Sequence, residues 1–315
     1  MNFFKHAIPL LAASLLLISC GGEVESAQLA SESRASETVA QGLYNSAVTA
    51  EKAGKLGKAT KLYKKIVLRH PLCPVAPESA FRWGKLLERD LEPIEAFDAY
   101  DAILTRYPAS PHYAEAMKRQ EVIATQVAEG QITKSLIGFK MPIDLKKSAE
   151  LLSKVRQNAP RAPSAEKAQY TIGRIYQSRG SGTTDTIRTI SAFRELTRDF
   201  PDSKYAPDAQ YRIGEILLAE SRKGNQDSAN LDRAKRAFED VLIRYPDSKQ
   251  AKLARAQIQK LASGDIQRSY EIAEFYRKKD QIPSALFYYR EAVNRSKPGP
   301  LRTTAQAWIK KLSAQ

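Results

Sequence analysis

Residues 77–108 read PESAFRWGKLLERDLEPIEAFDAYDAILTRYP, and this stretch decides the fold. Its apolar side chains recur every three or four positions, which is the period of an amphipathic helix. Gly84 and Ala96 are small where two helices would cross closely, and Tyr100 is among the large side chains that would fill the space around them. Pro108 cannot continue a helix and ends the second one. The stretch therefore predicts two helices packed as a hairpin.

The same punctuation recurs along the chain. Helix-ending prolines are expected at Pro71, Pro108, Pro160, Pro201, Pro246 and Pro298, so the intervals are 37, 52, 41, 45 and 52 residues. Helical signals at such intervals are typical of stacked helix pairs. The spacing within 77–108 resembles the tetratricopeptide repeat (TPR), a unit of about 34 residues. We therefore predict an all-α fold over residues 38–315, a TPR-like α-solenoid of about six helix pairs in a right-handed superhelix.

One short motif predicts where helices begin. The sequence PDSK occurs at 201–204 and again at 246–249, each time directly after an aromatic residue. Because a Ser side chain accepts hydrogen bonds from the free N–H groups of a first helical turn, Ser203 and Ser248 are expected to cap the helices that follow.

The third helix pair has the weakest pattern. Its first helix is expected near 110–128, and its second contains Leu152 and Val155. The segment between them, near 129–142, is predicted to be irregular. It includes the apolar stretch IGFKMP at 137–142, which either folds back on its own repeat or contacts a partner.

The N-terminus predicts the compartment. Residues 1–20 read MNFFKHAIPLLAASLLLISC, in which Lys5 precedes an apolar run too short to span a bilayer, as in an export signal. The final four residues, LISC, resemble the lipobox of bacterial lipoproteins, in which the Cys carries lipid and begins the mature chain. The resemblance implies a lipoprotein signal peptide at 1–19, lipidation of Cys20 and a flexible tether over 20–37. An ordinary signal peptide with an incidental Cys is the alternative.

The location and the charge narrow the choice of partners. Gly21 stands where an Asp would resemble an inner-membrane retention signal, so we expect an outer-membrane location, lipid-anchored and facing the periplasm. The net charge is +15, but an exported chain meets no genome, so nucleic acid is excluded as a partner. Anionic lipid headgroups and acidic proteins remain, with a plain basic surface as the alternative. The most basic stretch is 51–69, with Lys52, Lys55, Lys58, Lys61, Lys64, Lys65 and Arg69.

No catalytic constellation stands out in the sequence. His70 and His112 have no His or Cys neighbours at metal-ligand spacing and are expected to be capping or surface residues. Cys73 is expected to be an inert, partly buried thiol. The GSGTT segment at 180–184 lacks the spacing and the Lys of a phosphate loop. We therefore predict a protein that is not an enzyme and has no metal site and no cofactor.

The first helix of each TPR pair lines the concave side of a solenoid, as the resemblance implies. In the first unit that face includes Gln41, Tyr44, Val48 and Lys52, and in the second it includes Phe81, Lys85 and Arg89. Aromatic rings flanked by cations suit an extended peptide that carries apolar side chains and a carboxylate. These residues are the candidate peptide-binding groove, with a purely structural role for Tyr44 and Phe81 between repeats as the alternative.

Residues 204–313 resemble the BamD family, the TPR lipoproteins of the outer-membrane β-barrel assembly machinery. The resemblance is carried by the order and spacing of AQYRIGEILLAES, RAKRAFEDVLIRYPDS, AKLARAQIQKLA, SYEIAEFYRKKDQIPSALFYYREAV and LRTTAQAWIKKL. It implies a non-enzymatic scaffold that holds unfolded outer-membrane protein clients in its N-terminal units. Its C-terminal units would dock the barrel insertase through POTRA domains. Tyr288 aligns with a partner-contacting Arg of that family, and Arg290 lies two positions later, so both are candidate docking residues.

Two other functions remain open at the level of sequence. A periplasmic TPR adaptor for cell-envelope or peptidoglycan enzymes would use the same packing. An extra helix pair near 143–200 favours the adaptor slightly, whereas the order of the blocks over 204–313 disfavours it. An envelope hydrolase or transferase that carries TPR units would need a catalytic constellation, and the sequence offers none.

Overall fold

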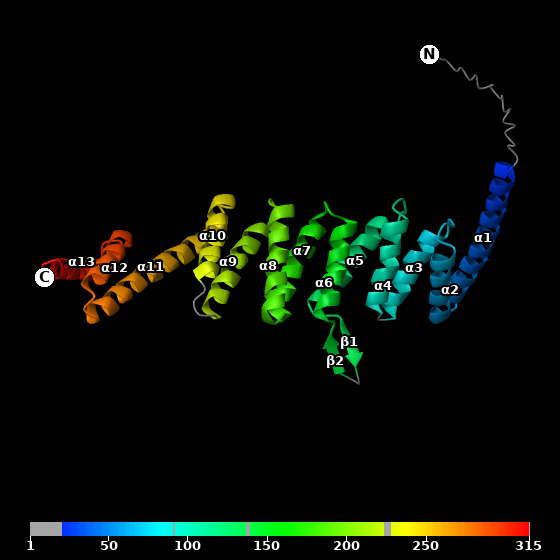
Figure 1. The fold of residues 1–315 in the computed structure, drawn as a ribbon. Coiled ribbons are helices and arrows are strands. Elements are labelled where there is room, and N and C mark those ends of the chain that lie inside the picture. Colours follow the sequence, from blue (N-terminus) through cyan, green and yellow to red (C-terminus); the bar gives the residue numbers. More distant parts are fainter. Residues whose placement is uncertain (1–20, 91, 137–138, 224–227, 315) are drawn as a thin grey trace, which may run out of the picture. The chain divides into compact units, whose positions relative to one another are not determined.

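A computed structural model describes residues 21–314 except residue 91, residues 137–138 and residues 224–227. The predicted signal peptide and Cys20 lie outside the described residues. The chain forms two compact units, one up to Gln120 and one from Glu121 on. Helices dominate both units (Figure 1), and this confirms the predicted all-α class. None of the described helices is long and apolar enough to cross a membrane.

The first unit consists of consecutive packed helices. They are α1 (Gly21–Lys52), α2 (Leu56–Arg69), α3 (Ala76–Arg89), α4 (Pro93–Arg106) and the first part of α5 (Tyr113–Ala128). Helix α1 packs on α2, α2 on α3 and α3 on α4. Each helix buries one apolar side, and the largest fully buried side chains are Tyr63, Ile66, Phe97, Tyr100 and Ile103. The stretch 77–108 is thus the α3–α4 hairpin.

The second unit continues the pattern. After the last turns of α5 it contains α6 (Leu145–Asn158), α7 (Pro163–Arg179), α8 (Gly182–Asp199), α9 (Ala206–Lys223), α10 (Ser228–Arg244), α11 (Lys249–Lys278), α12 (Ile282–Arg295) and α13 (Pro300–Leu312). Consecutive helices again pack side by side, α7 with α8, α9 with α10 and α11 with α12. The tandem helix pairs predicted from the sequence are therefore present in both units.

A β-hairpin replaces the irregular segment expected near 129–142. Strand β1 (Thr133–Leu136) pairs antiparallel with β2 (Phe139–Pro142), with Thr133 opposite Pro142 and Leu136 opposite Phe139. It projects from the helices beside α6 (Figure 1). The prediction of an irregular loop was wrong because four-residue strands are too short to show a period. Residues 137–138 of the IGFKMP stretch lie outside the described residues.

Helix α1 is longer than expected. From the sequence, residues 20–37 are expected to form a flexible tether and the repeats are expected to begin at residue 38. In the structure, residues 21–37 form the first half of α1. Ser, Ala and Glu dominate this stretch, and no Pro interrupts it, so a helix that is stabilised further along can extend through it. A role as a tether remains a prediction.

Small residues allow the helices of a pair to approach closely. A Cβ atom added to Gly84 in α3 would lie 2.6 Å from the ring of Tyr100 in α4. A Cβ atom at Gly214 in α9 would lie 2.5 Å from the ring of Phe238 in α10. Such distances are closer than van der Waals contact, so only Gly fits. This confirms the packing role that the sequence predicts for Gly84.

One helix joins two hydrophobic clusters of the second unit. The first lies between α8, α9, α10 and the start of α11, with Phe193 and Phe238 fully buried. The second lies between the end of α11, α12 and α13 around the fully buried Tyr289. Helix α11 has 30 residues and runs from one cluster to the other (Figure 1). The C-terminal helices are thus attached to the preceding pairs through α11.

Candidate protein-interaction surfaces

The first helices of three pairs carry the same ion pair. In each, an Arg follows an acidic residue by four positions: Arg82 with Glu78 in α3 (2.6 Å), Arg119 with Glu115 in α5 (2.8 Å) and Arg212 with Asp208 in α9 (2.5 Å). Each Arg also reaches back to the first helix of the preceding pair. The partners are Glu51 for Arg82 (3.1 Å), Glu88 for Arg119 (2.6 Å) and Gln177 for Arg212 (3.1 Å). These bridges fix the spacing of neighbouring first helices.

In the first unit the bridge grows into a network. Arg82 contacts both Glu51 and Glu78, the Tyr63 hydroxyl donates to Glu51 (2.8 Å), and His112 pairs with Glu78. Burial raises the pKa of Glu78, but the hydrogen bonds from Arg82 and His112 outweigh it and hold that pKa below its ordinary value. The network therefore stays charged at neutral pH. Sequence reasoning missed it, although the repeated acid-to-Arg spacing of four residues was a visible signal.

An equivalent network in the second unit is centred on Asp208. Its carboxylate accepts hydrogen bonds from the Tyr170 hydroxyl (2.5 Å), from Arg212 and from Gln250 (3.3 Å). Burial raises the pKa of Asp208, but the hydrogen bonds from Tyr170 and Arg212 lower it by more. The pKa of Asp208 therefore lies below its ordinary value. These three donors come from α7, α9 and α11, so one carboxylate ties three first helices together.

The candidate peptide-binding groove divides into packed rings and exposed cations. Tyr44 and Phe81 are half-buried: Tyr44 lies 6.0 Å from the Tyr63 ring, and Phe81 stacks on His112 at 4.2 Å. Lys85 lies over the Phe81 ring at 5.7 Å. The remaining members are the half-buried Val48 and the exposed Gln41, Lys52 and Arg89. The rings thus serve the packing between pairs and still present part of their surface, with cations beside them.

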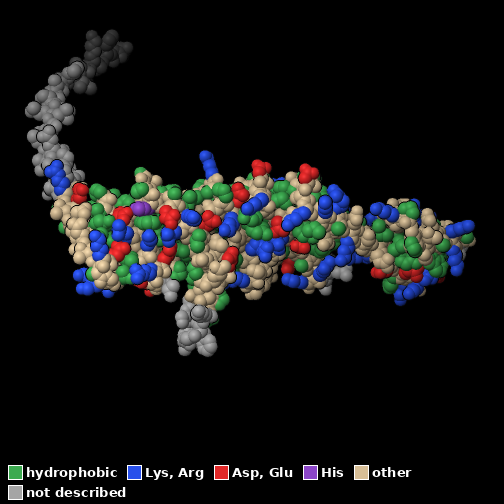
Figure 2. All heavy atoms as spheres, turned by 180° about the vertical axis from the view of Figure 1, so that it is seen from behind, with side chains coloured by type: hydrophobic (Ala, Val, Ile, Leu, Met, Phe, Trp, Pro, Cys, Tyr) green, Lys and Arg blue, Asp and Glu red, His purple; other side chains and the backbone are tan. Residues whose placement is uncertain are grey.

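The C-terminal helices expose a group of aromatic rings. We call Phe275 and Tyr276 of α11 together with Phe287 and Tyr288 of α12 the C-terminal aromatic patch. Tyr276 and Tyr288 stack at 5.6 Å, and each has a Phe ring edge-on beside it. Phe275 is 57% exposed and Phe287 is 63% exposed. Figure 2 shows hydrophobic side chains at this end of the chain, with basic and acidic side chains around them.

Polar and cation–π contacts join the helices α11, α12 and α13, which carry or adjoin the patch. Tyr289 is buried, and its hydroxyl donates to Glu274, which also pairs with Arg277 (2.7 Å). Burial and then the Glu274 carboxylate raise the pKa of Tyr289, so it remains a donor at neutral pH. Arg277 in turn lies over the Trp308 ring at 4.2 Å, which joins α13 to the pair. These contacts therefore fix the positions of the helices that carry the patch.

The two candidate docking residues lie on different sides of α12. Tyr288 is half-buried against Tyr276, whereas Arg290 is exposed. Two positions along a helix correspond to a rotation of about 200°. Arg290 shares its side of the helix with Phe287, three positions earlier. The structure thus brings Tyr288 into the patch and places Arg290 on the side of α12 that carries Phe287, away from Tyr288. Phe275 and Phe287 are patch residues that were not predicted from the sequence.

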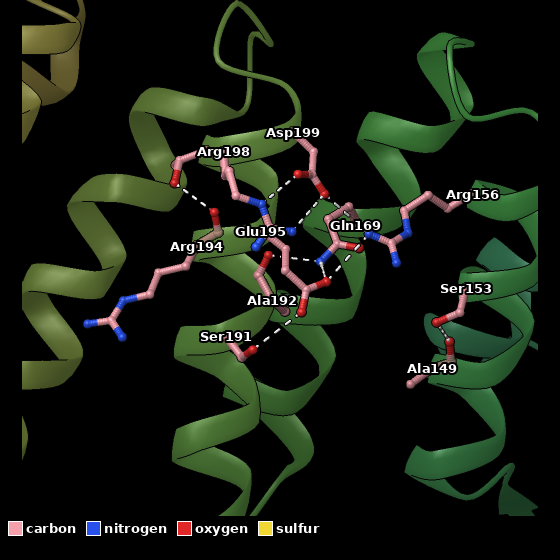
Figure 3. A network of polar contacts seen from close by, with 11 residues as sticks. Ala149, Ser153, Arg156, Gln169, Ser191, Ala192, Arg194, Glu195, Arg198 and Asp199 are labelled. Carbon is pink, nitrogen blue, oxygen red and sulfur yellow. Dashed lines mark hydrogen bonds and ion pairs between the residues drawn. The ribbon is translucent and has the colours of Figure 1, made fainter. Parts of the chain in front are cut away.

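In two helix pairs, a Gln side chain of the first helix binds a backbone carbonyl of the second helix. The Gln169 side-chain amide donates to the Ala192 carbonyl (2.9 Å) and to Glu195 (3.2 Å), and Arg156 approaches Glu195 (3.4 Å; Figure 3). In the next pair, Gln210 makes the same bonds to the Ala237 carbonyl (3.2 Å) and to Asp240 (3.3 Å). This repetition indicates a structural role.

A basic pocket of about 780 Å³ lies between α8, α9 and α10. Gln210, Ile213 and Leu217 line it, together with the arginines Arg194, Arg198, Arg233, Arg236 and Arg244. Arg244 donates to the Thr197 carbonyl (2.6 Å), and Arg198 pairs with Asp199 (2.7 Å). Two carboxylates, Glu239 and Asp240, also line the pocket. In the part of the chain that the structure describes, neither of them pairs with Arg194 or Arg236, so arginines outnumber carboxylates there and the pocket is basic.

The two histidines and the cysteine that were candidates for catalysis or metal binding take part in packing or in hydrogen bonds. His70 accepts or donates a hydrogen bond with Ser36 (2.8 Å), His112 belongs to the Glu78 network, and Cys73 is buried as a free thiol. Among the described residues, no three His, Cys, Asp or Glu side chains gather as metal ligands would. The described residues of this chain thus offer surfaces for binding.

Tandem helix pairs with partly exposed aromatic and charged side chains define a helical-repeat scaffold of the kind that binds other proteins. The comparison with protein families makes the kind of repeat explicit, because the tetratricopeptide repeat model matches residues 208–248. This match covers most of α9 and all of α10. No curated protein sequence matches the chain.

Several solved structures are similar to parts of this chain. MamA 41-end from Desulfovibrio magneticus RS-1 is 15% identical, with 67% of this chain and 97% of that chain covered and a TM-score of 0.30. A tetratricopeptide repeat protein from Parabacteroides merdae ATCC 43184 is 13% identical, with coverages of 88% and 99% and a TM-score of 0.29. The apo form of RapI is 10% identical, with coverages of 86% and 99% and a TM-score of 0.31.

Proposed function

We propose that this chain is a non-enzymatic, lipid-anchored scaffold of the outer-membrane β-barrel assembly machinery. It faces the periplasm from an anchor at Cys20. Its N-terminal unit holds segments of unfolded outer-membrane proteins, and its C-terminal helices dock the barrel insertase through POTRA domains. The proposal rests on the lipobox-like end of the signal, on the resemblance of residues 204–313 to the BamD family and on the surfaces described above.

The C-terminal aromatic patch is the observation that carries this proposal. Phe275 and Phe287 expose more than half of their surface to water. Large exposed apolar groups of this kind are typical of protein-binding sites, where aromatic residues supply most of the binding energy. The patch lies within the segment that resembles the BamD family, and it contains the candidate docking residue Tyr288. Exposed Arg290 next to Phe287 adds the charged rim that such sites carry.

The N-terminal unit supplies the second surface of the proposed scaffold. Tyr44 and Phe81 present partly exposed rings, and Lys52, Lys85 and Arg89 lie exposed on the same helices. An extended client segment would place apolar side chains on the rings and a carboxylate on the cations. Half-buried rings that also pack against Tyr63 and His112 are held in fixed positions, which lowers the entropy lost on binding.

A pull-down from detergent-solubilised envelopes, read by mass spectrometry, tests the docking surface. The test variant is Phe275→Ser/Phe287→Ser, which removes the two most exposed rings without touching buried Tyr289. The matched control is Ile187→Ser/Ile243→Ser, because these residues are 62% and 76% exposed on α8 and α10. Wild type and control should recover an insertase that carries POTRA domains, and the patch variant should lose it.

Two results would contradict the proposal. Equal recovery of the insertase by the patch variant and the wild type would place the docking surface elsewhere. Recovery of peptidoglycan enzymes, with no insertase in any sample, would favour the periplasmic adaptor instead. Circular dichroism of each variant, compared with wild type, separates loss of binding from loss of fold.

A further inference from the structure

Helix α2 presents a straight row of exposed side chains on its outer side. Lys58, Lys61, Lys65 and Leu68 recur at intervals of three and four residues, which places them on one face of the helix. Leu72 follows in the turn after the helix. We call these five residues the α2 stripe. Leu68 is 56% exposed and Leu72 is 98% exposed. The opposite side of α2 buries its apolar residues against the rest of the unit.

The positive charge around the stripe has no local compensation. Helix α2 contains no Asp or Glu, and the exposed cations Lys52, Lys55, Lys64 and Arg69 flank the stripe. In the described part of the chain, no carboxylate pairs with any of these seven cations. Glu51, the carboxylate nearest in sequence, is already bound by Tyr63 and Arg82. The surface therefore attracts anions from outside the chain.

The two leucines lie at the end of α2 that faces the start of α1. The Ser36 hydroxyl is hydrogen-bonded to His70 (2.8 Å), so the end of α2 lies beside α1 at residue 36. Helix α1 begins at Gly21 and rises about 1.5 Å per residue, so it extends about 22 Å beyond this point. The apolar end of the stripe is therefore the end nearer to the proposed anchor at Cys20.

The composition of the surface favours lipid over protein. Six of the seven cations are Lys, which acts as a point charge and neutralises phosphate without a fixed geometry. Specific protein interfaces are instead depleted in Lys and enriched in Arg and aromatic residues. Exposed leucines beside a basic face are typical of helices that lie in the interface of a bilayer. Both features fit phospholipid headgroups and the acyl boundary beneath them.

We propose that the α2 stripe binds the surface of a bilayer that contains anionic phospholipids. The lysines contact headgroup phosphates, and Leu68 and Leu72 enter the interfacial region. The contact orients the N-terminal unit on the membrane. This proposal rests on the proposed function only in that the lipid anchor brings the N-terminal unit close to the membrane. Unlipidated protein therefore tests the binding of the α2 stripe to a bilayer independently of any insertase.

Vesicle co-sedimentation of the unlipidated chain from residue 21 on, which contains all described helices, is the test. Wild type should bind vesicles of phosphatidylcholine mixed with phosphatidylglycerol, should ignore phosphatidylcholine alone, and should bind more weakly as salt is raised. Lys58→Glu/Lys61→Glu/Lys65→Glu should weaken binding by at least about 100-fold, from the usual contribution of each basic residue near an anionic surface. Leu68→Ser/Leu72→Ser should weaken it even at low salt.

Lys249→Glu/Lys252→Glu/Lys260→Glu is the matched control, because it makes the same charge change at three exposed positions of α11. It should retain the larger part of the binding. Equal losses in the stripe variant and the control would show a response to net charge alone and would overturn the proposal. So would a wild type that ignores anionic vesicles but loses an acidic protein partner when the stripe is reversed. The insertase pull-down is unaffected by either result.

Discussion

At the scale of single residues, glycine positions report the closeness of helix pairs. Gly214 lies against the Phe238 ring, whereas Gly264 in α11 has open space around the position of a Cβ atom. Both are helical, so both would gain the helix propensity of Ala, about 1 kcal/mol. They differ only in the room available for a methyl group, which makes them a matched pair.

We expect Gly214→Ala to lower the free energy of unfolding by about 1–3 kcal/mol, because overpacking against Phe238 outweighs the gain in propensity. Gly264→Ala should raise it by about 0.5–1 kcal/mol. Chemical denaturation of both variants measures the difference. If Gly214→Ala is as stabilising as Gly264→Ala, the close crossing of α9 and α10 is wrong.

Asp208 predicts a pH dependence of stability. Its pKa is lower in the folded chain than in the unfolded chain, where Asp has a pKa of about 3.9. Above that value both states are ionised and the stabilisation is complete. As the pH falls, the unfolded chain binds the proton first, so the stabilisation is lost as the pH passes through the lower, folded pKa.

Replacing the carboxylate tests this at the same site. Asp208→Asn should lower the free energy of unfolding by about 1–3 kcal/mol at pH 7, because a charged acceptor of several hydrogen bonds is lost. The difference from wild type should shrink as the pH is lowered from 5 to 3. Urea denaturation across this range is the measurement, and a difference that stays constant would show that Asp208 is not the titrating group.

At the scale of elements, identical motifs have different roles. Ser248 is the N-cap of α11, and its hydroxyl accepts from the Ala251 amide (3.1 Å). Ser203, in the other PDSK motif, lies in the turn before α9 and accepts from the Tyr205 amide (3.2 Å). The N-cap prediction is therefore confirmed for Ser248 and wrong for Ser203, since α9 begins only at Ala206.

Ser248→Ala should lower the free energy of unfolding by about 1 kcal/mol, the usual cost of removing an N-cap. Ser248→Asp should restore it, because a carboxylate accepts the same bond and also favours the positive end of the helix. Thermal denaturation compares the variants. A Ser248→Ala protein as stable as wild type would mean that water replaces the cap.

The elements show what the sequence could predict and why it stopped there. Long amphipathic segments such as α3 and α4 have a strong period and a terminating Pro, so their existence was predictable. The β1–β2 hairpin was not, because its strands hold four residues each. The aromatic patch was predicted only in part. Phe275 and Phe287 stand at helical spacing from other apolar residues, as buried residues do, so the sequence pattern does not mark them as exposed. Only tertiary packing decides which rings remain exposed.

At the scale of the whole molecule, the surfaces are divided between the units. The first unit carries the candidate groove and the α2 stripe, and the second carries the basic pocket and the C-terminal aromatic patch. Each unit has its own ion-pair network, centred on Arg82 or on Asp208. A scaffold built in this way can hold different partners without their competing for one site, and contacts that are weak singly become strong when they act together.

Helix α11 determines the direction in which the C-terminal helices face. Leu261 of α11 packs against the first cluster and Tyr270 against the second, and the intervening residues 262–264 are exposed, so α11 connects the two clusters. Each residue inserted there would turn the aromatic patch by about 100° and move it by about 1.5 Å, whereas seven residues would return it to nearly the same direction about 10 Å farther out. The length of this one helix therefore determines the direction in which the chain presents its C-terminal rings. A change in that length could redirect the scaffold without altering any residue that a partner touches.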